Sequence, residues 1–123
     1  WDMHGGGFPH VALASVLRDK GMPPPKPPSI DASKLDAMRA LWRDAGIDEV
    51  ETRQITVQRT FADFEAFWTA SCATTSLRTI LGRLPASDID HIRSQLRERV
   101  PAASDGTITH GARANAVKGR LPR

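Results

Sequence analysis

Apolar residues recur at three- and four-residue spacing in several stretches of the chain, a pattern typical of helices with one buried face. The clearest stretch covers residues 33–45, and one of its faces carries Leu35, Met38, Leu41, Trp42 and Ala45. A weaker one covers residues 8–20. A third covers 87–100, where the apolar face carries Ile89, Ile92, Leu96 and Val100. A further helix, rich in aromatic residues, is expected to open near residue 60.

Capping signals suggest where these helices begin and end. Three Ser/Thr-x-x-Asp pairs match the capping-box pattern: Ser33 with Asp36, Thr60 with Asp63, and Ser87 with Asp90. Gly21 and Gly46 stand where a left-handed residue ends a helix. Five prolines within residues 22–29 exclude a helix or a central strand there.

Two stretches predict strands. Residues 47–58 are rich in Val, Ile and Thr, but their alternation slips between Thr52 and Ile55, which indicates either two partly covered faces or a bulge. Residues 106–119 alternate, with small apolar residues on one side: Ile108, Ala112, Ala114 and Ala116. Two strands are too few for an independent sheet, so we expect a further strand from an upstream segment.

The expected organisation is one partial α/β domain. Its parts are a loop (1–7), a helix (8–20), a Pro-rich connector (21–32), a helix plus strand (33–58), a helical insertion (60–100, with a short helix around 76–81) and a terminal strand (106–119). A helix, a glycine and then a strand form the repeating unit of a layered sheet.

Composition narrows the class of protein. With 123 residues, about 40% of them hydrophobic and 25% charged, the chain suits one folded domain. The formal charge of +3 is spread over mixed acids and bases, which favours a solvated surface over a nucleic-acid stripe, apart from a basic tail after Asp105. A single cysteine excludes an internal disulfide, and no apolar run is long enough to span a membrane. We expect a cytoplasmic protein.

Four segments, in order, resemble one family. They are WDMHGG (1–6), LWRDAGIDEVE (41–51), FADFEAFW (61–68), and DGTI with ARANAVKG (105–119). Together they resemble the C-terminal part of class I S-adenosylmethionine-dependent methyltransferases of the ubiquinone and menaquinone biosynthesis type. The chain departs from the family in its Pro-rich segment (23–28) and at Asn115, where an aromatic residue is common.

The resemblance implies a fold and a missing part. The chain would supply strands six and seven of a Rossmann-like sheet, the seventh antiparallel, with a helical insertion between them. The cofactor-binding loop would lie upstream, so S-adenosylmethionine would be bound by the complete protein and weakly or not at all by this chain. The partners would be a small-molecule methyl acceptor and either a complementing N-terminal half or a second copy.

The resemblance also directs attention to the first loop and the aromatic helix. Asp2 and His4 could act as an acid-oriented base, although two ordinary loop residues are the simpler interpretation. Trp1 and three aromatic residues of the insertion could line the acceptor pocket: Phe64, Phe67 and Trp68. Helical spacing equally fits a plain core. We expect Cys72 to be buried filler, Gly5-Gly6-Gly7 to be a flexible hinge, and no metal site.

A rival from another class stays open. In that interpretation the chain is a non-catalytic interaction module that completes its sheet by dimerisation or with a partner chain, because unpaired strand edges promote association. Binding of RNA by the basic tail is a weaker third interpretation.

Overall fold

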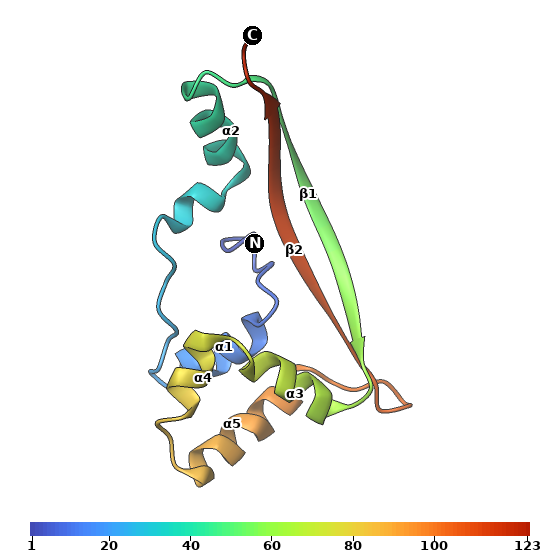
Figure 1. The fold of residues 1–123 in the computed structure, drawn as a ribbon. Coiled ribbons are helices and arrows are strands. Elements are labelled where there is room, and N and C mark those ends of the chain that lie inside the picture. The colour runs from blue at the N-terminus through green and yellow to red at the C-terminus, as the bar shows by residue number, and fades with distance from the viewer. The chain divides into compact units, whose positions relative to one another are not determined.

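The computed structural model describes all 123 residues and divides the chain into two compact units. Unit 1 comprises Trp1–Pro9, Lys26–Val57 and Gly111–Arg123, and unit 2 comprises His10–Pro25 and Gln58–His110. The chain combines five α-helices with a two-stranded antiparallel sheet (Figure 1). This confirms the predicted α/β character.

Every predicted helix and strand is present, with shifted ends. In chain order the elements are α1 (Val11–Asp19), the 3-10 turn η1 (Ile30–Ser33), α2 (Leu35–Asp44), β1 (Asp48–Phe61), α3 (Phe64–Cys72), α4 (Thr75–Leu81), α5 (Ala86–Arg99) and β2 (Ile108–Arg120). The short helix expected around residues 76–81 is α4, and the Pro-rich connector ends in η1. None of the helices has both the length and the apolar character needed to cross a membrane.

The capping box predicted for α3 is wrong, because the preceding strand continues further than expected. Thr60 belongs to β1, and its hydroxyl lies 2.8 Å from the hydroxyl of Thr109 on β2. Asp63, predicted as the second member of the box, is itself the N-cap. Its carboxylate accepts a hydrogen bond from the amide of Ala66 at 2.8 Å.

The other two capping boxes are also wrong. α2 begins after Lys34, and the Ser33 hydroxyl donates instead to the carbonyl of Ile30 at 2.8 Å. α5 begins after Pro85, and no side chain caps it, so Ser87 lies inside its first turn. In both cases a proline-containing or 3-10 segment sets the first residue of the helix, and the Ser-x-x-Asp spacing does not reveal this.

The glycines behave as predicted at the helix ends. Gly21 and Gly46 adopt φ values of 77° and 78°, in the left-handed region that ends a helix without steric cost for glycine. Gly106, in the turn before β2, has a φ of 85°. These positions fix where α1 and α2 stop and where the last strand starts.

The β1–β2 ladder keeps one register from end to end. Four pairs of side chains mark it: Glu49–Arg120 at 3.1 Å, Glu51–Lys118 at 3.0 Å, Gln54–Asn115 at 3.2 Å and Thr60–Thr109 at 2.8 Å. Both strands advance by the same number of residues between the first and last pair. No bulge therefore interrupts the ladder, and this excludes one of the two explanations for the slipped alternation.

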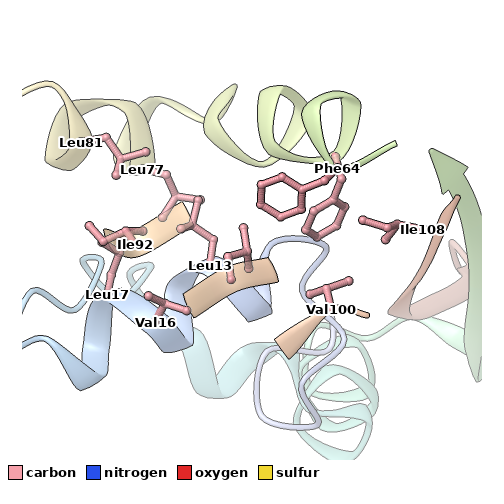
Figure 2. Packing of buried hydrophobic residues seen from close by; sticks show 11 residues of the cluster. Leu13, Val16, Leu17, Phe64, Leu77, Leu81, Ile92, Val100 and Ile108 are labelled. Carbon is pink, nitrogen blue, oxygen red and sulfur yellow. The ribbon is translucent and has the colours of Figure 1, made fainter. Parts of the chain in front are cut away.

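The hydrophobic core lies entirely in unit 2. Its buried members come from α1, α3, α4 and α5, from the residue after α5 and from the first residue of β2: Leu13, Val16, Leu17, Phe64, Phe67, Leu77, Leu81, Ile92, Leu96, Val100 and Ile108. Figure 2 shows side chains of this cluster close together. The predicted apolar stripe of α5 is confirmed, since three of its members are in this cluster. Arg99 adds an ion pair with Asp19 at 2.5 Å, which ties α5 to α1.

Unit 1 has no comparable core. α2 contains no buried residue. All the large hydrophobic residues that are exposed belong to this unit: Trp1, Leu41, Trp42, Ile55, Val57 and Leu121. Unit 1 is therefore held together largely by the β ladder and by polar contacts.

Within unit 1, the polar contacts that α2, η1 and the first loop make with the hairpin fall on one of its faces, and the cross-strand ion pairs of Glu49 and Glu51 fall on the other. Arg39 of α2 donates to the Thr52 hydroxyl at 2.5 Å, and the Asn115 amide donates to the carbonyl of Ser33 at 2.8 Å. Because side chains alternate along a strand, the opposite face of the hairpin carries several apolar residues, and we call it the open face. Its members are Ile55, Val57, Ala112, Ala114 and Ala116. Ile55 and Val57 are 44% and 51% exposed.

This uneven burial predicts uneven sensitivity to truncation. Leu96→Ala in the core of unit 2 should lower the free energy of unfolding by about 2–5 kcal/mol, because it leaves a cavity at a fully buried site. Leu41→Ala, at a site 56% exposed on α2, should change it by less than about 0.5 kcal/mol. Urea unfolding followed by circular dichroism compares the two variants. Equal losses would contradict the assignment of the core to unit 2.

Candidate functional site

The first loop of the chain is fastened to β2 by its backbone. The amide of Asp2 donates to the carbonyl of Arg113 at 2.9 Å, and the amide of Arg113 donates to the carbonyl of Gly7 at 2.9 Å. A third bond, from the Gly7 amide to the Asp2 carbonyl at 2.8 Å, closes the loop on itself. Because both backbone groups of Arg113 are used in this way, the loop lies on the edge of β2 that does not face β1.

Side chains reinforce this attachment. Both Nε and Nη2 of Arg113 donate to one carboxylate oxygen of Asp2, at 2.8 and 2.7 Å, and the amide of Gly5 donates to the other oxygen at 3.1 Å. Nη2 also donates to the carbonyl of Gly5 at 2.7 Å. Asp2 is only 6% exposed, so a charge that would be costly to bury alone is neutralised by Arg113. The hydrogen bond from Arg113 holds the pKa of Asp2 below its ordinary value.

The glycines of the loop have steric roles, so the expectation of a plain hinge is incomplete. A side chain at Gly5 would overlap the Asp2 carboxylate, and one at Gly7 would overlap the carbonyl of Arg113. Gly6 adopts a φ of 73° with open space around it. The glycines therefore allow the loop to lie directly against Arg113.

His4 has an acidic neighbour, but it is not Asp2. Its Nε2 lies 2.9 Å from Oδ1 of Asp31, in η1 at the end of the Pro-rich connector, and the same oxygen lies 3.1 Å from Nζ of Lys34. The hydrogen bond from Lys34 is the main cause that lowers the pKa of Asp31, so this carboxylate is ionised at neutral pH. We call this the His4–Asp31 pair. In a neutral imidazole, a proton on Nε2 leaves Nδ1 as an acceptor.

The aromatic residues of α3 lie in unit 2 and serve mainly as core. Phe64 and Phe67 are 5% and 2% exposed, and the Phe67 ring packs edge-on against that of Phe61 with centroids 5.3 Å apart. Trp68 is half-buried, and the Arg93 guanidinium lies 5.3 Å from the centre of its ring. The plain-core interpretation therefore holds for the two phenylalanines, while Trp68 packs against the same core and is only partly buried. Trp1, in unit 1, is 52% exposed.

Cys72 is a half-buried thiol at the end of α3. Burial raises its pKa to about 11, so at neutral pH it is protonated and a poor nucleophile. It packs against the core of unit 2. These properties match the filler role predicted for it.

Two residues that position the candidate site escape the reasoning from sequence: Arg113 and Asp31. The sequence places Arg113 only in a basic tail, whereas it is the partner of Asp2. A signal is present, since it is the one charged residue among the small residues 106–117, on a strand expected to be packed. Asp31 lies at the end of the Pro-rich connector, whose path the sequence does not specify, so no spacing rule connects it with His4.

Comparison with known proteins adds no relative: neither the protein-family models searched nor the curated proteins contain a match to this chain. The family expected from the sequence therefore rests on the four family-like segments alone.

The Asp2–Arg113 contact predicts a pH dependence. Because the folded pKa of Asp2 is lowered, its contribution to stability is present above the ordinary pKa of an aspartate and is lost as the pH falls through the lowered value. Asp2→Asn should remove this part of the acid profile, measured by thermal unfolding across the acidic range. Asp44→Asn, at an exposed aspartate without an ion pair, serves as the control and should leave the profile unchanged. Identical profiles for Asp2→Asn and the unsubstituted chain would contradict the role of the contact.

Proposed function

We propose that this chain is the C-terminal part of a class I S-adenosylmethionine-dependent methyltransferase and contributes the acceptor side of its site. Support comes from the order of elements, in which a helix and a glycine lead into β1, three helices follow, and β2 returns antiparallel. The four family-like segments fall on these elements in the expected sequence. The Rossmann-like sheet itself extends beyond what the two strands of the chain supply.

The attachment of loop 1–7 to Arg113 is the observation that carries the proposal. In the family that the chain resembles, the segment equivalent to residues 1–6 follows the fifth strand of the sheet. In this structure the loop forms backbone hydrogen bonds with the outer edge of β2. A strand leading into this loop would continue along that edge. It would add a third strand beside β2, and its flanking helices could cover the open face, as helices cover both faces of a layered sheet.

The glycine-rich loop of this chain packs onto Arg113 and Asp2, and this supports a cofactor site elsewhere in the protein. Binding of S-adenosylmethionine is therefore assigned to the upstream half of the protein.

His4 is the residue of this chain best suited to handle the proton of an acceptor. Asp31 accepts a hydrogen bond from Nε2, which fixes the ring, and Nδ1 can then accept a proton from a hydroxyl or amine. Trp1, three residues before it, offers an exposed ring against which a flat acceptor can stack. Asp2 acts by holding the loop, not by orienting the imidazole. Methyl transfer depends mostly on alignment, so this base assists the reaction without being obligatory.

A calorimetric titration tests the proposal. S-adenosylmethionine is titrated into the chain alone and into a longer form that includes the upstream coding sequence. Binding by the longer form only is the expected result. Binding by neither would overturn the proposal, and binding by the chain alone would contradict the assignment of the cofactor to the upstream half.

Substitutions in the longer form test the His4–Asp31 pair. His4→Ala should lower kcat by about 10²-fold or more, the usual contribution of a positioned general base, and Asp31→Asn should have a smaller effect in the same direction. Lys34→Ala, which removes the other cation beside Asp31, is the matched control and should leave kcat within about twofold. An unchanged kcat in His4→Ala would show that alignment alone suffices.

A second candidate function, a non-catalytic interaction module, is favoured by one observation. β1 makes no backbone hydrogen bond to any segment other than β2, so its outer edge is unpaired.

A further inference from the structure

The outer edge of β1 can be located residue by residue. Arg113 directs both its amide and its carbonyl away from β1, and in the observed register it stands opposite Thr56. In an antiparallel pair, two residues that stand opposite each other either both direct their backbone groups toward the partner strand or both direct them away from it. The even-numbered residues of β1 therefore direct their amides and carbonyls outward, and Val50, Thr52 and Gln54 lie on this edge.

Nothing in the sequence of β1 protects this edge. The strand has fourteen residues, contains no proline, glycine or lysine, and is rich in β-branched residues. Long edges of this kind pair readily with another strand, and proteins usually block them with proline, lysine or a bulge. β1 has charges, but along one face two acids, Glu49 and Glu51, are followed by two bases, Arg53 and Arg59.

Two of these charges, Glu51 and Arg53, are available to a partner. Glu51 is 67% exposed and contacts Lys118 of β2 at 3.0 Å, a surface pair that leaves most of its carboxylate in solvent. Arg53 is exposed and forms no ion pair within the chain. An acid and a base two residues apart are self-complementary in antiparallel pairing, because each meets the opposite charge across the two-fold axis.

We propose that a second copy of this chain pairs antiparallel with the outer edge of β1, with the two-fold axis at Thr52. In this register Glu51 of each copy stands directly opposite Arg53 of the other. These are the closely spaced positions of an antiparallel ladder, where opposite charges stabilise. Moving the axis by one residue in either direction would place Glu51 against Glu51 or Arg53 against Arg53, which is destabilising.

The product is a four-stranded sheet in the order β2–β1–β1–β2. A two-stranded hairpin with an open apolar face is marginal by itself, and four strands form a more stable unit. The dimer does not rest on the methyltransferase proposal, because it is argued from β1 alone. The two are also compatible, since the dimer leaves unoccupied the outer edge of β2, where a further strand is expected.

Charge reversal tests the register. Glu51→Arg and Arg53→Glu should each raise the dimer dissociation constant about tenfold or more, because each turns two attractive pairs into repulsive ones. The double variant should restore it to within about threefold, and this recovery cannot come from the contact with Lys118, which stays lost. Sedimentation velocity measures all four proteins. A monomer at every concentration, or a double variant as weak as the single ones, would overturn the proposal.

A matched pair at Gln54 tests the backbone contribution. Gln54→Ala removes only the side-chain contact with Asn115 and should leave dimerisation nearly unchanged. Gln54→Pro also removes an outward amide, which the ladder with β2 does not use, and should abolish the dimer. Equal dimerisation by the two variants, with circular dichroism showing both folded, would contradict edge pairing.

Disulfide trapping tests the axis directly, in a Cys72→Ala background. Thr52→Cys places two cysteines opposite each other across the axis, within reach of a disulfide, so oxidation should give a covalent dimer. Gln54→Cys places them about 13 Å apart and should give little cross-linking. Equal cross-linking of both variants would contradict the register. None of these measurements involves S-adenosylmethionine, so this proposal and the methyltransferase proposal can fail separately.

Discussion

The single register of the β1–β2 ladder is the constraint on which the organisation of unit 1 depends. Because side chains alternate along a strand, a fixed register decides which residues share a face, and a slip by one residue would exchange the two faces. In this chain it gathers Thr52, Asn115 and Arg113 on the face that α2, η1 and the first loop cover with polar contacts. The same register leaves Ile55 and Val57 on the open face, and it defines the outer edges of the hairpin.

Burial is divided unevenly between the two units. Every member of the hydrophobic core comes from unit 2, whereas unit 1 exposes two tryptophans and buries a carboxylate. Hydrophobic burial is the main favourable term in folding, so unit 1 gains much less of it than its apolar content would allow. Each of the two proposals would add a structural element to unit 1. A strand on the outer edge of β2, with its helices, would cover the open face, and a second copy on β1 would pair the other edge.

The Asp2–Arg113 contact links the fold to the candidate site. It holds the loop that carries Trp1 and His4, so the positions of these residues depend on a buried ion pair and on two glycines that permit close approach. His4 is then placed beside Asp31, which arrives from the Pro-rich connector. A base and its orienting acid are thus supplied by two segments that are distant in sequence, and each is held by a separate set of contacts.

The sequence by itself determined the elements and much of their burial pattern. Apolar spacing located α2 and α5, glycines marked the ends of α1 and α2, and β-branched residues located β1, because these signals are local. The capping residues were wrong, since the end of a strand or of a 3-10 turn is set by pairing and packing around it. The tertiary structure was needed to show that no residue of α2 is fully buried, that Phe64 and Phe67 are core, and that Asp2 pairs with Arg113 while His4 pairs with Asp31. Contacts between segments far apart depend on the path of the chain between them, and no spacing rule encodes that path.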